Sequence, residues 1–166
     1  MAFDCFLKID GVDGECTDEK HKNWIEILSY SHGVLQLASG SRSSGGARSA
    51  ERCDHQDFSC VKTLDKTSPK LNLWCCNGKH IANIKMELCR ATGNKQKYME
   101  YDMEDVIISS VRPGGSSQGG AELPLEEVSL NYGKIEWKYT ETDHKTGAAG
   151  GTIPTWWDLV SNKGSS

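Results

Sequence analysis

The sequence predicts a mainly β fold, an antiparallel β-barrel or sandwich of about eight strands with one short flanking α-helix. Three observations lead to this prediction. In most of the chain apolar side chains alternate with polar ones, the pattern of strands with one buried face. Clusters of turn residues separate these stretches at short intervals. Only residues 65–80 carry both the start and the stop signals of a helix.

Length and charge limit the class of protein. We expect 166 residues to form one domain over 1–166 with a hydrophobic core. The net charge of −4, with both signs interspersed, gives no reason to expect nucleic acid as a partner. No apolar run approaches the roughly 20 residues that span a bilayer, so no membrane insertion is expected. The N-terminal stretch, which contains Asp4 and Lys8, lacks the pattern of a signal peptide.

Seven cysteines are expected to be free thiols. Their number is odd, and without a secretory signal the compartment of synthesis should be reducing. Small core hydrophobes are the default role for such residues. The seven are Cys5, Cys16, Cys53, Cys60, Cys75, Cys76 and Cys89.

The first third of the chain should supply three strands. Residues 3–9 alternate with one apolar face, and a polar connection then leads to a second strand. That strand is expected to begin near Trp24 and to continue past Gly33 to Leu37. A third strand is expected over residues 55–63.

An extended loop, residues 38–52, separates the second and third strands. It is rich in small residues and too poor in apolar side chains to fold alone. Its arginines, Arg42, Arg48 and Arg52, could bind a partner, or the loop could be a solvated flexible segment. The sequence leaves both interpretations open.

The helix should lie between Asp65 and His80. Ser68 is predicted to be the N-cap, and Pro69 suits the first helical position. Asn77-Gly78 provides a left-handed exit.

This helix has apolar side chains on two sides. At about 100° per residue, Leu71, Trp74 and Cys75 share one side. Leu73 and Cys76 fall on roughly the opposite side. A short helix of this kind needs two surfaces to pack on.

The remainder of the chain continues the strand pattern. Strands are expected over residues 81–91, 97–103, 106–111, 128–132 and 135–139. Turns are expected at 92–94, 113–120 and 133–134. The C-terminal tail, 142–166, begins as a linker, but the adjacent Trp156 and Trp157 indicate that its end docks on the protein.

Cysteine and histidine residues offer one possible site. Cys53, His55 and Cys60 could begin a zinc site, but no C-x-x-C pair exists and a fourth ligand would have to come from elsewhere. No local signature supports a Cys–His nucleophile pair. Ordinary core thiols are the better interpretation.

Two further motifs also fail to indicate an enzyme. The Gly-rich stretch 113–120 follows a strand, but it lacks the lysine and the following helix of a phosphate loop. Glu100, Asp102 and Glu104 share a strand face, where a solvated barrel surface is favoured over an acid–base pair or a cation site. We therefore expect no cofactor, no metal and no catalysis.

Several short motifs nevertheless occur in a fixed order along the chain. The N-terminal motifs are Asp4-x-Phe6-x-Lys8-Ile9, Gly14-Glu15, Asp18 with His21, Ile25-x-Ile27, and Ser31, Gly33 and Gln36. The later motifs are Asp65–Pro69 with Leu71, Gly78–His80, the strand from Val106, Asn131-Tyr132, Trp157-Asp158-Leu159 and Asn162. Together they resemble one family, Hcp, the haemolysin-coregulated tube protein of bacterial type VI secretion. The chain departs from the residues usual in that family at Cys16 (usually serine), His32 (usually tryptophan) and Trp156 (commonly glycine).

The resemblance implies a β-barrel with one flanking helix, six copies of which form a homohexameric ring. It also implies that rings stack head to tail into an inner tube, which a contractile sheath expels together with a spike protein. Secreted effectors would be held inside the ring. The protein would leave the bacterial cytoplasm through this machinery without a signal peptide, and no bond would be made or broken. The competing interpretation is a monomeric β-barrel that binds a ligand or acts as an enzyme.

If the chain forms such rings and tubes, three groups of residues are expected to make the contacts. Leu73 and Cys76 are expected to contact the neighbouring subunit of the ring. The residues expected to contact the next ring are Arg42, Ser43, Ser44, Gly45, Gly46 and Arg48. Ser116 and Ser117 are the candidates for facing the lumen and its cargo, with a plain surface turn as the alternative.

Overall fold

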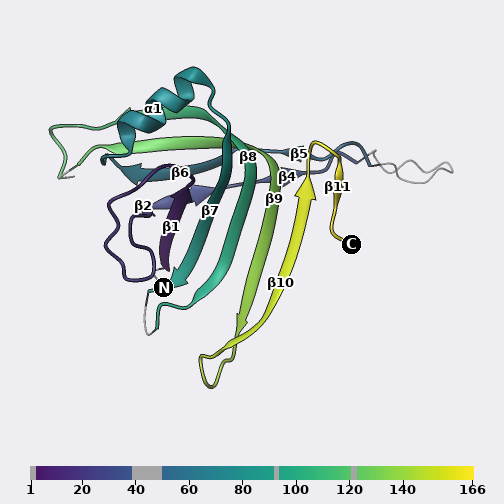
Figure 1. Ribbon diagram of the computed structural model, residues 1–166. Coiled ribbons are helices and arrows are strands. Elements are labelled where there is room, and N and C mark those ends of the chain that lie inside the picture. Colours follow the sequence, from purple (N-terminus) through teal and green to yellow (C-terminus); the bar gives the residue numbers. More distant parts are fainter. Residues whose placement is uncertain (1–2, 39–49, 92–93, 121–122) are drawn as a thin grey trace.

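The computed structural model describes residues 3–38, 50–91, 94–120 and 123–166 (Figure 1). The elements before the helix are β1 (Phe3–Ile9), β2 (Ile25–Ile27), β3 (Ser29–Ser31), β4 (Val34–Leu35), β5 (Asp54–His55) and β6 (Phe58–Thr63). The helix is α1 (Ser68–Asn77). The elements after it are β7 (Ile81–Arg90), β8 (Lys97–Gly114), β9 (Leu125–Thr142), β10 (Ala149–Asp158) and β11 (Lys163–Gly164).

Antiparallel pairing joins nine of these strands into one curved sheet (Figure 1). The order is β11-β10-β9-β8-β7-β1-β2, and β6 pairs with both β9 and β3. Only Leu28 separates β2 from β3 in the chain, and its N–H donates to the Val61 carbonyl of β6 (2.8 Å). The β2 end of the sheet therefore approaches β6, which gives the sheet a barrel-like shape. The predicted mainly β fold with one flanking helix is confirmed.

The strand count differs from the prediction because the early strands are short. The expected strand from Trp24 to Leu37 is divided into β2, β3 and β4, and the expected strand over 55–63 into β5 and β6. β4 and β5 pair with each other as a separate two-stranded sheet. Alternation of side chains predicts where the chain is extended, but not which neighbour each piece pairs with.

β8 and β9 are each one long strand where the sequence predicted two. The turn predicted at Gly133–Lys134 is wrong, because the ladder continues on both sides of it, from Glu104↔Lys134 to Val106↔Tyr132. Between these pairs Asp105 has a φ of 52°, and a Cβ on Gly133 would lie 3.0 Å from Asp105 Oδ2. A bend at which the Asp105 side chain lies against Gly133, rather than a turn, interrupts the alternation there.

The segment after residue 142 contributes an edge of the sheet. β10 pairs with β9 from Ala149↔Thr142 to Asp158↔Lys134. Trp156 and Trp157 lie in this strand and are half-buried, so the terminus does contact the protein, as expected. The linker composition of residues 149–152 did not prevent a strand, because cross-strand pairing with β9 satisfies its backbone.

The core is built from strands throughout the sheet together with the inner face of α1. Its members include Leu7, Phe58, Met86, Leu130 and Ile135, each at most 1 % exposed. All seven cysteines are free, as predicted. Burial raises the pKa of Cys5 and of Cys60 to about 12, so these two thiols remain uncharged core groups.

A buried ion pair anchors the start of α1. Lys62 on β6 and Glu126 on β9 are cross-strand partners, 1 % and 0 % exposed, with Lys62 Nζ 3.0 Å from Glu126 Oε2. Lys62 Nζ also lies 3.0 Å from Asp65 Oδ1. The Ser68 hydroxyl accepts from Lys62 Nζ (3.2 Å) and donates to Glu126 Oε2 (2.6 Å). The first residue of the helix is thus fixed to two strands.

This network corrects the predicted cap. The N-cap is Thr67, which makes no side-chain capping bond, and Ser68 is already helical. The Ser68 hydroxyl serves the buried ion pair instead of the helix backbone. The predicted C-terminal end of the helix is confirmed, because Gly78 has a left-handed conformation (φ 63°) and its N–H donates to the Trp74 carbonyl.

Removing one partner of this ion pair should destabilise the protein strongly. Lys62→Met leaves the fully buried Glu126 without its cation, and we expect a loss of about 3–5 kcal/mol in the free energy of unfolding, measured by urea denaturation. The double variant Lys62→Met/Glu126→Met should recover most of this loss, since it buries no charge. Equal stabilities of the single and double variants would contradict the proposed role of the pair.

Candidate functional surfaces

The inner face of α1 is fixed to the sheet. Leu71 is 1 % and Trp74 6 % exposed, and Cys75 is half-buried against the core. A Cβ on Gly11 would lie 3.3 Å from the Trp74 ring, so the turn after β1 packs tightly on this side chain. Lys79 Nζ lies over the same ring at 4.5 Å. The side of the helix predicted to face its own barrel does so.

The outer face of α1 is free in the single chain. Leu73 is 59 % exposed, and Cys76 is exposed on the same side. The structure therefore makes both side chains accessible, and their contact with a neighbouring subunit stays a prediction.

The Gly-rich connection between β8 and β9 lies beside the start of α1. The Leu64 N–H donates to the Pro124 carbonyl (3.0 Å), which ties the connection to the segment leading into the helix. Ser116 and Ser117 are exposed, and they line a shallow hollow together with Leu123 and Leu125. These leucines are 54 % and 44 % exposed, so small polar and large apolar groups share this surface.

The β4–β5 hairpin carries the base of loop 38–52 on the side of the molecule away from α1 (Figure 1). Its apolar residues Val34, Leu35 and Leu37 are 48 %, 48 % and 54 % exposed. Arg52 Nη2 donates to the Leu159 carbonyl (3.1 Å). The residues predicted to contact the next ring, from Arg42 to Arg48, lie outside the described residues.

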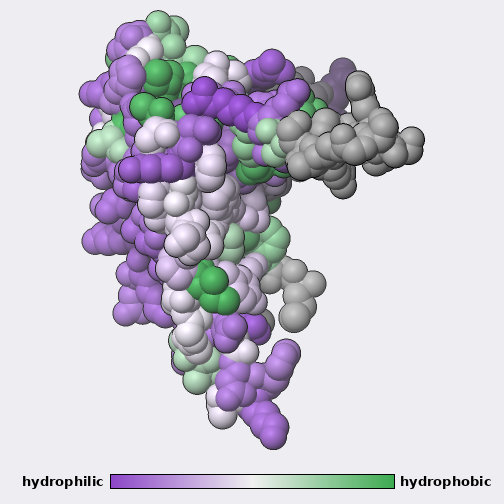
Figure 2. Space-filling view, turned by 90° about the vertical axis from the view of Figure 1, so that its right-hand side faces the viewer, coloured by the Kyte–Doolittle hydropathy of each residue, from purple (hydrophilic) through white to green (hydrophobic). Residues whose placement is uncertain are grey.

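β9 and β10 present a further exposed apolar pair. Ile153 lies directly opposite Tyr139, and the two are 55 % and 47 % exposed. Among the described residues, β10 has a second strand partner only at Trp157 and Asp158, where β11 pairs with it. The side of the molecule shown in Figure 2 is mainly of intermediate to hydrophilic character, with separate apolar areas.

The acidic residues predicted to form a solvated strand face are paired with lysines. Glu100 is only 4 % exposed and contacts Lys97 (2.6 Å) and Lys85 (3.3 Å). Burial acts to raise the pKa of Glu100, but the hydrogen bond and charge of Lys97 prevail and lower it. Lys138 Nζ forms ion pairs with both Glu100 Oε1 (3.8 Å) and Asp102 Oδ2 (3.9 Å). A carboxylate held in this way is a structural ion-pair partner.

The zinc ligands considered in the sequence are not brought together. His55 Nδ1 is 2.8 Å from the Tyr132 hydroxyl, and Cys60 is buried in the core. Within the described residues, the group of three potential ligands that does converge is His21, Glu87 and Cys89. The signal for it in the sequence is weak: Asp18-x-x-His21 and Glu87-x-Cys89 are separate short motifs, and no sequence pattern predicts that they lie side by side.

His32 is enclosed by aromatic rings near the β4–β5 hairpin. Its ring centroid is 5.3 Å from that of Phe58 and 5.7 Å from that of Tyr132. Neither ring nitrogen has a hydrogen-bond partner among the described residues. Burial lowers the pKa of His32, and the nearby His55 lowers it further, while burial also lowers the pKa of His55. The neutral imidazole is therefore the form that fits this site.

Stability should fall in mild acid because of His32. Its folded pKa lies below the unfolded value of about 6.5, so its contribution is complete above that pH and is lost as the pH falls through the folded pKa. Thermal unfolding from pH 7.5 to pH 5 should show a smaller loss of Tm for His32→Phe than for the wild type. The exposed His144→Asn is the control and should behave like the wild type. The same pH dependence in all three proteins would contradict the assignment.

No helix in the described residues combines the length and apolar character needed to cross a bilayer.

Comparisons with known proteins agree along the whole chain. Residues 6–139 match the family described as "Type VI secretion system effector, Hcp". Protein hcp1 of Pseudomonas aeruginosa is 35 % identical over 163 residues, which cover 98 % of each chain. A solved structure described as a type six secretion system protein superposes with a TM-score of 0.92 at 32 % identity, covering 99 % of this chain and 100 % of the other. Hcp1 from Salmonella typhimurium gives a TM-score of 0.80 at 33 % identity, with coverage of 99 % and 100 %.

Proposed function

The chain belongs to the Hcp family of type VI secretion tube proteins, and we propose that six copies of it close into a ring and that the rings stack head to tail. The role of this family is structural and not enzymatic. The family match supports the proposal, and so does the distribution of exposed apolar side chains over several separate surfaces of the single chain.

Ring closure requires two different surfaces on each subunit. A cyclic hexamer uses a heterologous, head-to-tail interface, so one patch on a subunit meets a different patch on the next. The outer face of α1, with Leu73 and Cys76, is one such patch. The exposed pair of Tyr139 and Ile153 on β9 and β10 is the candidate for the other.

Ring stacking is assigned to loop 38–52. The hairpin that carries this loop exposes Val34, Leu35 and Leu37, which gives an apolar base beside the small and basic residues of the loop. In this proposal Arg42, Ser43, Ser44, Gly45, Gly46 and Arg48 contact the adjacent ring.

Cargo contact is assigned to the Gly-rich connection. Ser116 and Ser117 would face the lumen, where the hollow beside Leu123 and Leu125 offers an apolar contact for a secreted effector. The proposed partners are thus other copies of the chain, effectors, the spike protein and the sheath. The protein would be made in the bacterial cytoplasm and exported by the type VI machinery.

Placing a charge on the outer face of α1 should prevent ring closure. Leu73→Asp alters a side chain that is 59 % exposed in the single chain, so the monomer should fold normally while the apolar contact is lost. Size-exclusion chromatography with light scattering should show monomer where the wild type shows hexamer. Leu28→Asp, at a leucine that is 55 % exposed, is the matched control and should remain hexameric. An intact Leu73→Asp hexamer, or dissociation of both variants, would show that this face is not the specific contact.

Shortening the long loop should separate stacking from ring closure. Deletion of residues 43–49 leaves the β4–β5 hairpin in place, so hexamers should persist while tubes fail to form under conditions in which the wild type makes them. Negative-stain electron microscopy distinguishes rings from tubes. Tubes of normal length in the deletion variant would rule the loop out as the stacking element.

A further inference from the structure

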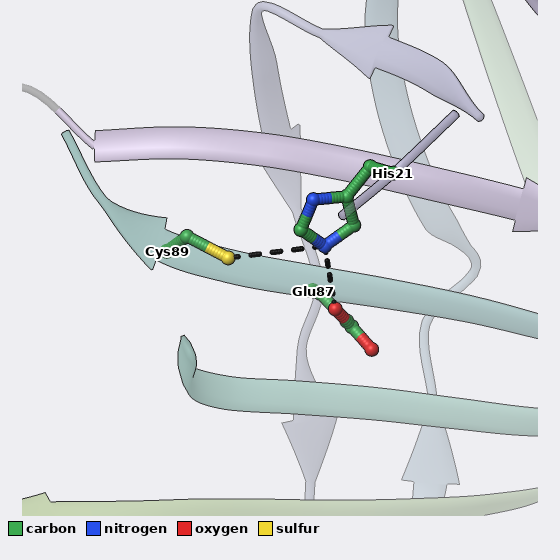
Figure 3. A group of neighbouring side chains, drawn as sticks. All are labelled: His21, Glu87 and Cys89. Atoms are coloured by element: carbon green, nitrogen blue, oxygen red, sulfur yellow. Dashed lines mark hydrogen bonds and ion pairs between the residues drawn. The ribbon is translucent and has the colours of Figure 1, made fainter. Parts of the chain in front are cut away.

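Three potential metal ligands converge beside β7, and the tube function uses none of them. Glu87 and Cys89 are two residues apart on this strand and so point to the same face. His21, from the connection between β1 and β2, lies over them (Figure 3). Its Nε2 is 2.7 Å from Glu87 Oε2 and 4.0 Å from Cys89 Sγ, and the three ligand atoms all lie within 4.8 Å of one another.

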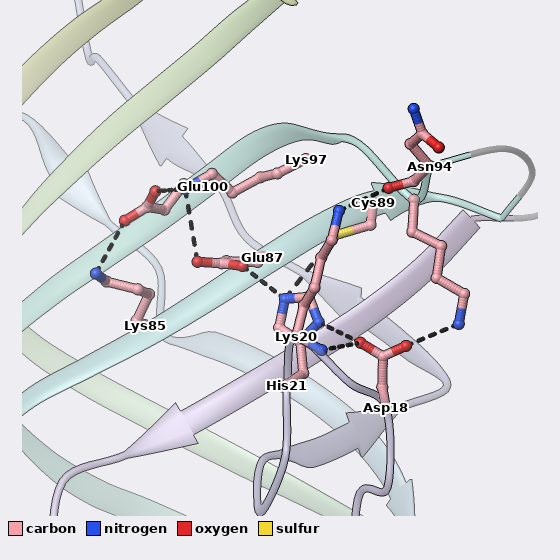
Figure 4. Close-up of polar contacts among 10 residues, drawn as sticks. Asp18, Lys20, His21, Lys85, Glu87, Cys89, Asn94, Lys97 and Glu100 are labelled. Carbon is pink, nitrogen blue, oxygen red and sulfur yellow. Dashed lines mark hydrogen bonds and ion pairs between the residues drawn. The ribbon is translucent and has the colours of Figure 1, made fainter.

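The imidazole is held in the orientation that a metal ligand requires. Its Nδ1 is 2.8 Å from Asp18 Oδ2 (Figure 4), and Lys95 Nζ lies 2.8 Å from the other Asp18 carboxylate oxygen. The ring stacks on Phe6 with 4.1 Å between centroids, which restricts its rotation. Metal-binding histidines commonly donate their second N–H to a carboxylate in this way. Asp18 thus directs the Nε2 atom toward Glu87 and Cys89.

An ion could reach these atoms from solvent. A hollow in the surface is lined by all three ligands and continues past Lys97 to the start of β10 at Ala149. Lys97 Nζ lies 3.5 Å from Glu87 Oε1 but 2.6 Å from Glu100 Oε2, so it keeps a carboxylate partner when Glu87 turns toward an ion. The hollow also provides room for water or another small ligand in a fourth position.

We propose that His21, Glu87 and Cys89 form a binding site for a divalent transition metal of the zinc class, with Asp18 positioning the imidazole. One nitrogen, one carboxylate oxygen and one sulfur form a donor set that suits zinc, whereas calcium and magnesium prefer oxygen alone. Binding would release the proton shared by His21 and Glu87 and the proton of the Cys89 thiol to the solvent. The Nε2 to Oε2 distance would widen to about 3.3 Å, as tetrahedral coordination requires.

Such an ion would join the β1–β2 connection to β7. Since the site lies within one chain, binding should raise the thermal stability of the single subunit as well as of any assembly.

Cobalt(II) is the probe for the site, because thiolate ligation and tetrahedral geometry give characteristic absorption bands. The reduced full-length protein should show both on titration with Co²⁺, and equimolar Zn²⁺ should abolish them and raise the Tm. Cys89→Ser should lose the thiolate band, and Asp18→Asn should bind about 10–100-fold more weakly.

Cys53→Ser is the matched control, since Cys53 is a partly exposed free thiol that precedes β5 and does not line the site. It should retain the full spectrum. If Cys89→Ser fails to fold by circular dichroism, Glu87→Gln provides the test and should weaken binding while retaining the thiolate band. The proposal is overturned if the wild type shows no thiolate band, if the band survives in folded Cys89→Ser, or if it is lost in Cys53→Ser.

Discussion

The buried ion pair of Lys62 and Glu126 is the constraint on which the arrangement of the surfaces depends. It connects β6 to β9, and through Ser68 it fixes the start of α1 on that pair of strands. Burial of two charges is favourable only when both are paired and hydrogen-bonded, so the network tolerates few alternative positions of the helix. From this fixed start, the helix places Trp74 inward and Leu73 outward. The exposed face proposed as a subunit contact is therefore a consequence of a polar interaction in the interior.

The bend shared by β8 and β9 separates the other surfaces. One half of β9 pairs with β6 and the other with β10, and the change occurs near Gly133, where the strand passes close to Asp105. The Gly-rich connection thus lies beside α1, while Tyr139 and Ile153 lie on the part of the sheet formed with β10. A subunit built this way offers different patches in different directions, which head-to-tail closure requires.

Sequence reasoning was strongest where side-chain periodicity decides the structure. The end of α1 at Gly78, the inward position of Leu71 and Trp74, the strand over residues 3–9 and the Hcp resemblance are all confirmed. Prediction failed where the structure depends on pairing between strands. The sequence predicted a turn at Gly133, where the β8–β9 ladder continues, and a linker at the start of β10, where the chain pairs with β9. The sequence predicts Ser68 as a helix cap because nothing in it indicates that Ser68 contacts Lys62 and Glu126. Glu126 is distant in the chain, and Lys62 stands in an ordinary alternating strand pattern. The convergence of His21 with Glu87 and Cys89 was missed for the same reason.

The central claim is that this chain is a ring-forming subunit whose contact surfaces are built into a stable single-chain barrel. Electron microscopy of the purified wild-type protein tests it most directly, because class averages report ring closure and its symmetry without a partner or label. The account predicts closed rings with six subunits. A uniform population of monomers at concentrations well above those used for imaging, or rings of another symmetry, would contradict it.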